Sequence, residues 1–137
     1  MIFADTGFFI AQLKPRDGLH LRARDWAVWI ARNQTPILTT EFVLIELGDA
    51  LSAPADRAKY HAALSHLFGA KQIEIVSVSL DWFQKGVALH KARPDKEWSL
   101  TDCISFVVMQ ERGISRALAY DHHFEQAGFE ALLRREP

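Results

Sequence analysis

The feature that most constrains this chain is the regular alternation of short apolar segments with longer segments of helical pattern along its 137 residues. We predict strands in the short apolar segments, at 1–4, 37–39, 73–76, 116–120 and 129–133. We predict helices in the amphipathic or apolar segments between them, at 8–13, 18–32, 41–51, 55–68, 80–92 and 101–112, with a turn or short helix at 121–126. Strands that alternate with helices are typical of a parallel sheet covered on both faces. The sequence therefore predicts an α/β fold with a central parallel sheet flanked by helices.

The composition is that of an ordinary globular chain. Hydrophobic residues make up 49% and charged residues 24% of the sequence, and no internal repeat, low-complexity tract or Gly/Ser-rich linker interrupts it. A chain of this length buries a sufficient core without disulfides or a structural metal. We expect a single domain over residues 1–137.

Charge and cysteine usage limit the partners and the location. The net charge is −1, which argues against a protein that holds nucleic acid through a uniformly positive surface, so affinity would come from local patches or from a partner. The lone Cys103 cannot form an internal disulfide, which fits a reducing compartment. The apolar N-terminus lacks a positively charged start and contains Asp5, so we do not expect a signal peptide. We expect a cytoplasmic protein without a membrane-spanning segment.

Four acidic residues are candidates for one metal site. Asp5 directly follows the first predicted strand, and Asp121 directly follows the strand that ends at Tyr120. Ligand sites of parallel sheets lie at the carboxyl ends of the strands, where both acids should project. Asp102 lies in the first turn of a predicted helix, and Glu46 lies among apolar neighbours where an uncompensated charge is costly. Carboxylate oxygens suit Mg²⁺ or Mn²⁺ better than zinc.

Each of these acids also has a purely local explanation. Asp5 fits the turn sequence Asp-Thr-Gly between a strand and a helix. Asp102 fits the last position of a capping box that begins at Ser99, and Asp121 fits a helix cap. Glu46 could simply face solvent. What favours a site is that three of the acids fall at or beside one edge of the sheet, and the fourth, Glu46, lies on a helix that starts from that edge.

Four motifs give the chain a resemblance to a known family. They are Phe3-Ala4-Asp5-Thr6-Gly7, Thr39-Thr40-Glu41-Phe42-Val43-Leu44-Ile45-Glu46-Leu47, Ser99-Leu100-Thr101-Asp102-Cys103 and Ala119-Tyr120-Asp121-His122-His123-Phe124. Their order and spacing resemble those of PIN-domain nucleases, and among these the VapC-type toxins of bacterial toxin–antitoxin pairs. The resemblance covers essentially the whole chain.

The resemblance implies a function and a site. It implies a three-layer PIN-like fold and metal-dependent endonucleolytic cleavage of RNA, whether tRNA, rRNA or mRNA, with Mg²⁺ or Mn²⁺ as the cofactor. Asp5, Glu46 and Asp102 match the principal metal-site acids, and Asp121 matches the fourth. Thr6 and Ser99 match hydroxyl positions that support the site. The resemblance also implies a cognate antitoxin and a homodimer.

Basic and aromatic residues near the motifs are candidates for contact with the substrate. Lys96 and Arg116 are the candidates for phosphate contacts that we retain, although either could be an ordinary solvated charge. Trp98 could stack on a base, but packing is the favoured interpretation. Trp26 and Trp29 share one helical face, which fits either the core or a groove for a second copy or an antitoxin.

The histidines and the cysteine beside the acidic motifs are not expected to take part in catalysis. The pair His122 and His123 lacks a second His or Cys ligand nearby, so we expect a local hydrogen bond rather than zinc binding. Cys103 lies in an apolar helix and is more plausible as a small core residue than as a nucleophile.

Two rival functions remain open from the sequence. One is an enzyme with another phosphate substrate, such as a phosphatase or a DNA nuclease, although the phosphatase signature of two aspartates two residues apart is missing at Asp5. The other is a catalytically silent PIN-like binding module, which would have no evident reason to retain four acids. Metal-dependent cleavage of mixed RNA would distinguish the three.

Overall fold

A computed structural model describes all residues of the chain, and it contains five strands and eight helical segments. The strands are β1 (Ile2–Ala4), β2 (Ile37–Thr40), β3 (Ile73–Val76), β4 (Arg116–Leu118) and β5 (Glu130–Ala131). The helices are α1 (Thr6–Leu13), α2 (His20–Asn33), α3 (Glu41–Ala50), α4 (Pro54–Gly69), α5 (Leu80–Ala92), α6 (Leu100–Glu111), α7 (His122–Gln126) and the 3₁₀ helix η1 (Leu132–Arg134).

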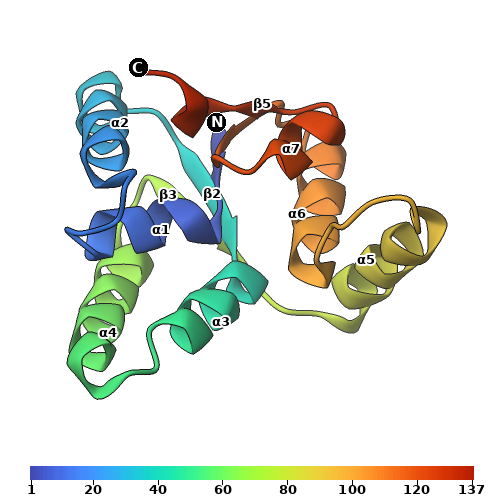
Figure 1. The fold of residues 1–137 in the computed structure, drawn as a ribbon, viewed down its shortest axis with the longest axis horizontal. Helices are drawn as coiled ribbons and strands as arrows, with labels where there is room; N and C mark the ends of the chain where they lie inside the picture. Colours follow the sequence, from blue (N-terminus) through green and yellow to red (C-terminus); the bar gives the residue numbers. More distant parts are fainter.

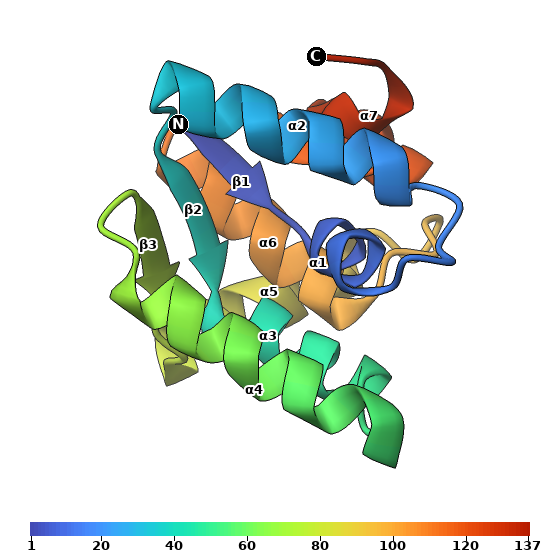
Figure 2. The ribbon, with the colours of Figure 1, turned by 90° about the vertical axis from the view of Figure 1, so that its left-hand side faces the viewer.

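The strands form one parallel sheet in the order β3-β2-β1-β4-β5. Helices α1, α2 and α4 cover one face of this sheet, and α5 and α6 cover the other (Figures 1 and 2). The predicted α/β fold with three layers and a central parallel sheet is therefore confirmed.

The core lies around the central strand and the helix behind it. All three residues of β1 are fully buried, and α6 contributes Cys103, Ile104 and Phe106 to the same apolar cluster. This explains why the first strand reads as a continuous apolar run, because a central parallel strand is covered on both faces. No helix of the chain is long and apolar enough to cross a membrane.

The predicted last strand, 129–133, is wrong in its second half. The strand ends at Ala131, and the chain continues as η1. Leu132 and Leu133 are consecutive and both fully buried. The only neighbour of β5 is β4, which ends at Leu118, so the chain beyond Ala131 soon has no strand to pair with and turns while both side chains remain in the core. The strand predicted at 116–120 likewise ends early, at Leu118.

The strand order places a crevice beside β1 and β4. From β1 the chain leads into α1 and α2 on one face, whereas it reaches β4 from α5 and α6 on the other face (Figure 1). Neighbouring strands whose connections diverge in this way form the point where α/β sheets bind ligands, outside the carboxyl ends. Asp5 follows β1 and Asp121 follows β4 by three residues, so this point falls between two of the predicted acids.

Candidate active site

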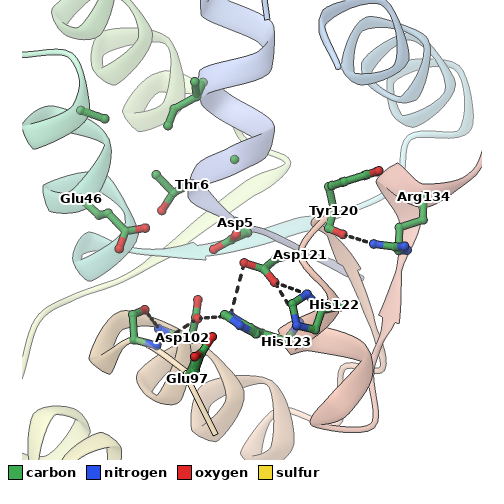
Figure 3. Close-up of a pocket in the computed structure, with 14 residues that line it drawn as sticks. Asp5, Thr6, Glu46, Glu97, Asp102, Tyr120, Asp121, His122, His123 and Arg134 are labelled. Atoms are coloured by element: carbon green, nitrogen blue, oxygen red, sulfur yellow. Dashed lines mark hydrogen bonds and ion pairs between the residues drawn. The ribbon is translucent and has the colours of Figure 1, made fainter. Parts of the chain in front are cut away.

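An open cavity of about 720 Å³ lies at the carboxyl ends of β1 and β4. All four predicted acids line it, from four different elements of the fold, together with the predicted supporting residues (Figure 3). These six residues are Asp5, Thr6, Glu46, Ser99, Asp102 and Asp121. The fold therefore brings together the residues that the sequence singled out.

Asp5 is held by the ladder of the central strands. Its backbone N–H donates to the Leu118 carbonyl at 3.3 Å, and the buried Thr39 hydroxyl donates to the Ala4 carbonyl at 2.8 Å. Asp5 occupies the N-cap position of α1 without a side-chain capping hydrogen bond, and its carboxylate lines the cavity.

The pKa of Asp5 is raised by its burial and by the acids around it. Burial, followed by the negative charge of Asp102 and a smaller effect of Glu46, raises the pKa of Asp5 from 3.8 to about 7. The backbone N–H groups of Thr6 and Gly7 act in the opposite sense without cancelling the rise. A carboxylate in this position is more costly to ionise than one in water, and a nearby cation would relieve that cost.

Asp102 caps helix α6 and also lines the cavity. It closes a capping box at the start of α6, in which its backbone N–H donates to Ser99 Oγ at 3.0 Å and the Ser99 N–H donates to Asp102 Oδ2 at 3.2 Å. The same carboxylate lines the cavity and lies 3.2 Å from Nδ1 of His123. The cap thus fixes the orientation of an acid that still faces the site.

Asp121 and the two histidines form the tightest cluster of polar side chains. Asp121 caps α7, since its Oδ1 accepts from the His123 N–H at 3.0 Å. The imidazole of His123, only 14% exposed, places Nδ1 3.3 Å from Asp121 Oδ2 and therefore bridges Asp121 and Asp102. Asp121, His122 and His123 bring ligand atoms within 4.8 Å of one another. The local hydrogen bonding expected of the histidines is confirmed, but it joins two site acids.

The donor set fits a bound divalent cation. Glu46 projects from α3 toward the other acids and is half-buried (Figure 3). The hydroxyl of Thr6 is buried in the same cavity wall and has no hydrogen-bond partner in the chain. Buried hydroxyls are normally paired, so an unpaired one in a wall shared with several carboxylates fits a site that takes a cation or its water.

The two predicted phosphate contacts do not line the cavity. Arg116 is the first residue of β4, level with Glu130 of β5, and lies at the amino end of a strand whose carboxyl end leads to the site. The fold therefore does not bring Arg116 to the cavity, because the strand begins with it instead of ending near it. Lys96 lies in the loop before α6 and pairs with Asp95 at 3.9 Å. A role for Lys96 in RNA binding stays a prediction.

The cavity has three further lining residues that sequence reasoning missed. Glu97 adds a fifth carboxylate, and Tyr120 and Arg134 form one rim. The Arg134 Nη1 donates to the Tyr120 carbonyl at 2.9 Å, and its guanidinium lies 4.8 Å from the centre of the Tyr120 ring. The adjacency of Tyr120 to Asp121 was a usable signal, whereas nothing in the sequence around Arg134 indicated the site.

Trp98, Trp26 and Cys103 are buried in the core, whereas Trp29 is only partly buried. Trp98 is buried against Phe106 and donates to Gln126 Oε1 at 3.1 Å, so the packing interpretation is confirmed. Trp26 is buried and donates to the Arg135 carbonyl at 2.9 Å, and Cys103 is fully buried. None of these side chains is available for chemistry in the cavity.

Comparison with known proteins agrees with this geometry. The family model of the PIN domain matches residues 2–130. The chain is 31% identical over 130 residues to the 23S rRNA-specific endonuclease VapC20 of Mycobacterium tuberculosis, which covers 94% of this chain and 95% of that protein.

Two solved structures resemble the fold. The crystal structure of M. tuberculosis VapC20, described as a sarcin–ricin loop cleaving toxin, matches with a TM-score of 0.82 and 27% identity over 94% of this chain and 96% of that one. FitAcB from Neisseria gonorrhoeae matches with a TM-score of 0.65 and 15% identity over 96% of both chains, which bears on the fold alone.

Proposed function

Because this chain belongs to the PIN-domain family, we propose that it is a metal-dependent endoribonuclease and the toxin of a toxin–antitoxin pair. The observation that carries this proposal is the convergence of Asp5, Glu46, Asp102 and Asp121 on one cavity at the carboxyl ends of β1 and β4. The raised pKa of Asp5 supports it, because burial and, after it, the negative charge of Asp102 make the free carboxylate costly to ionise, and a bound cation would offset that cost.

Within the site, the four carboxylates would hold Mg²⁺ or Mn²⁺ through oxygen atoms. A bound divalent ion lowers the pKa of a water ligand and stabilises negative charge on a phosphodiester. The capping box with Ser99 orients Asp102, and His123 keeps Asp102 and Asp121 close together. Hydrolysis forms a bond between the water oxygen and phosphorus and releases the opposite ribose oxygen, which takes up a proton.

The first substrate to test is a structured ribosomal RNA. The support is the similarity to VapC20, which is described as acting on 23S rRNA and on the sarcin–ricin loop. An identity of 31% supports the same reaction class, while the choice among rRNA, tRNA and mRNA rests on the assay.

The direct test is cleavage of defined nucleic acids by the purified chain. We would incubate it with a sarcin–ricin loop stem-loop, total tRNA, an mRNA and a DNA copy of the stem-loop, each with Mg²⁺, Mn²⁺ or EDTA. We expect cleavage of at least one RNA with either ion and none in EDTA or on DNA. Cleavage that persists in EDTA would refute the metal mechanism, and cleavage of DNA alone would favour a DNA nuclease.

Substitutions then assign the reaction to the cavity. Asp5→Asn and Asp102→Asn keep the side-chain shape and remove the charge that holds the cation. Each should abolish most cleavage, and the double variant should be little worse than either, because residues of one site act as a unit. Asp25→Asn, on the exposed surface of α2, is the matched control and should cleave as wild type.

We further propose a cognate antitoxin and a homodimer as partners. The similarity to a protein described as a toxin supports the first. Exposed apolar side chains on α3 and α5, namely Ile45, Leu80, Phe83 and Val87, support the second. Expression alone should slow bacterial growth, and co-expression of a small protein encoded beside the gene should relieve it. Sedimentation should give twice the chain mass, and Phe83→Ser should shift it toward the monomer.

A further inference from the structure

We propose that Tyr120 and Arg134 form a subsite for one nucleotide that flanks the cleaved bond, with the base against Tyr120 and a phosphate against Arg134. This inference rests on the proposed ribonuclease function and names how the same cavity takes hold of its RNA. Both residues line the cavity that contains the four acids. Tyr120 directly precedes Asp121, so the subsite and the acids share one rim.

Tyr120 is an exposed aromatic residue at the edge of the cavity. It follows Ala119, which is fully buried, yet 47% of Tyr120 remains exposed. Its side chain points along the rim away from the four acids (Figure 3). An exposed aromatic ring beside a cavity for a nucleic acid is the usual platform on which a base stacks. The base that it holds would therefore lie beside the acids and not among them.

Arg134 supplies the only permanent positive charge in the cavity wall. Of the fourteen lining residues, five carry carboxylates, and Arg134 is the sole lysine or arginine. A polyanionic substrate must approach this acidic surface, and outside the metal position Arg134 is the one side chain that attracts it. Its place beside Tyr120, away from Asp5, Glu46 and Asp102, fits contact with a neighbouring phosphate (Figure 3).

The geometry of Arg134 leaves donors free for a ligand. Nη1 donates to the Tyr120 carbonyl at 2.9 Å, and Nε pairs with Glu125 at 3.1 Å. A guanidinium has five N–H donors, so three remain after these two contacts. The two contacts also fix the guanidinium plane 4.8 Å from the Tyr120 ring, which leaves the rest of that exposed ring open to a base. The pair is therefore held in place while guanidinium donors and part of the tyrosine ring remain free to bind a ligand.

Two other pairs of a cation and an aromatic ring in the chain lack this combination. Lys85 lies over Trp82 and Arg93 over Trp98, and neither pair lines the acidic cavity. Trp98 is also buried. The Tyr120 and Arg134 pair is the one in which an exposed ring, a cation and the four acids share a cavity.

Steady-state cleavage separates the subsite from the chemistry. We would use the RNA that wild type cleaves best in the presence of Mn²⁺. Tyr120→Ala removes the ring on which the base stacks and so weakens RNA binding. KM should rise by about 10- to 100-fold, with a smaller effect on kcat. Tyr120→Phe keeps the ring and should restore KM to near the wild-type value. Arg134→Ala should raise KM and reduce its dependence on salt, because one phosphate contact is lost.

Matched controls address general effects of the substitutions. Phe68→Ala removes an exposed ring on α4, outside the cavity, and Arg112→Ala removes a surface ion pair with Glu74. Both should leave KM unchanged. Circular dichroism should give the same folded spectrum for every variant.

A binding measurement tests the stacked base directly. In the Asp5→Asn background, in which most cleavage should be abolished, we would titrate the same RNA with 2-aminopurine placed at each nucleotide beside the mapped cleavage site. Stacking on Tyr120 should quench one of these positions, and Tyr120→Ala should abolish that quenching while Tyr120→Phe retains it. Binding by Tyr120→Ala should weaken by the same factor as KM rises.

The outcomes distinguish the subsite from the proposed function. If wild type cleaves RNA and Tyr120→Ala keeps both its KM and the quenching, the subsite is refuted and the nuclease function stands. If wild type cleaves no RNA, the proposed function is refuted. In that case quenching of a 2-aminopurine stem-loop, lost in Tyr120→Ala, would still support nucleotide binding, and its absence would refute the subsite too.

Discussion

The metal-free protein should become more stable as the pH falls, and Asp5 should be the cause. Burial and the charge of Asp102 raise the pKa of Asp5 from 3.8 to about 7 in the folded state, whereas the unfolded chain restores the ordinary value. The folded protein therefore binds the additional proton between about pH 4 and pH 7. Because the folded state binds more protons, the free energy of unfolding decreases as the pH rises through this window.

The expected magnitude follows from the two pKa values of Asp5. The full effect is a loss of about 4 kcal/mol of stability above pH 7, at about 1.36 kcal/mol for each tenfold change in proton affinity. When the pH is lowered from about 8 to about 5, the free energy of unfolding of wild type should rise by about 2–3 kcal/mol. For a chain of this size that corresponds to a rise in Tm of about 10 °C.

The assay compares melting curves of wild type and Asp5→Asn in EDTA from about pH 5 to about pH 8. The two proteins differ only at residue 5, so the difference between their melting curves reports on Asp5. Asp5→Asn should melt higher than wild type at the alkaline end, and the two should converge at the acidic end. Asp25→Asn, on the exposed surface of α2, should follow wild type throughout. A difference between Asp5→Asn and wild type that does not change with pH would refute the reasoning.

Metal should narrow the difference in stability between the two proteins at alkaline pH. Mg²⁺ at about 100 times its Kd stabilises a folded protein by about 2.7 kcal/mol. At the alkaline end wild type should gain this amount, because the cation favours the charged form of Asp5. Asp5→Asn should gain clearly less, since it has lost one ligand. Equal gains would exclude Asp5 as a ligand.

Three further substitutions test the surroundings of the site. Gly86→Ala should lower Tm at a cost of about 1–3 kcal/mol, because the new methyl group would overlap Ile104 of α6, whereas Gly69→Ala meets nothing within 4 Å and should leave Tm unchanged or higher. Ser99→Ala removes the capping box of α6 and should cost about 1 kcal/mol in a thermal melt. Thr6→Val removes a buried hydroxyl without a partner, so Tm in EDTA should stay or rise while cleavage falls. A lower Tm for Thr6→Val would indicate a structural role instead.

Features that depend on a short stretch of sequence could be predicted, whereas features that depend on contacts between distant residues could not. The elements from β1 to α6 were anticipated because each has a local period or a local stop. The end of the last strand was not anticipated, since Leu132 and Leu133 are apolar in either conformation, and only the core that they both enter selects the 3₁₀ turn. Such a choice belongs to tertiary packing and has no local signature.

The acids of the site were predictable because the chain places them relative to strands. Asp5 and Asp121 follow strands whose carboxyl ends meet, and this relation can be read from the sequence once the sheet is known to be parallel. The same reasoning misplaced Arg116, because it located the residue near a strand without asking at which end. The acids follow the carboxyl ends of their strands, whereas Arg116 lies at the amino end of β4.

Arg134 reaches the cavity through contacts that no local pattern encodes. After β5 the chain turns back along α2, where Trp26 Nε1 donates to the Arg135 carbonyl at 2.9 Å and Arg22 Nη1 donates to the Leu133 carbonyl at 3.2 Å. These two bonds, from residues more than a hundred positions earlier, hold the backbone on both sides of Arg134. Trp26, which the sequence assigned to the core or to a partner groove, therefore also holds the backbone next to Arg134. Helix α2 thereby links the apolar layer of the fold to the rim on which RNA is proposed to bind, and the shape of the subsite depends on the packing of a helix that contributes no lining residue to the cavity.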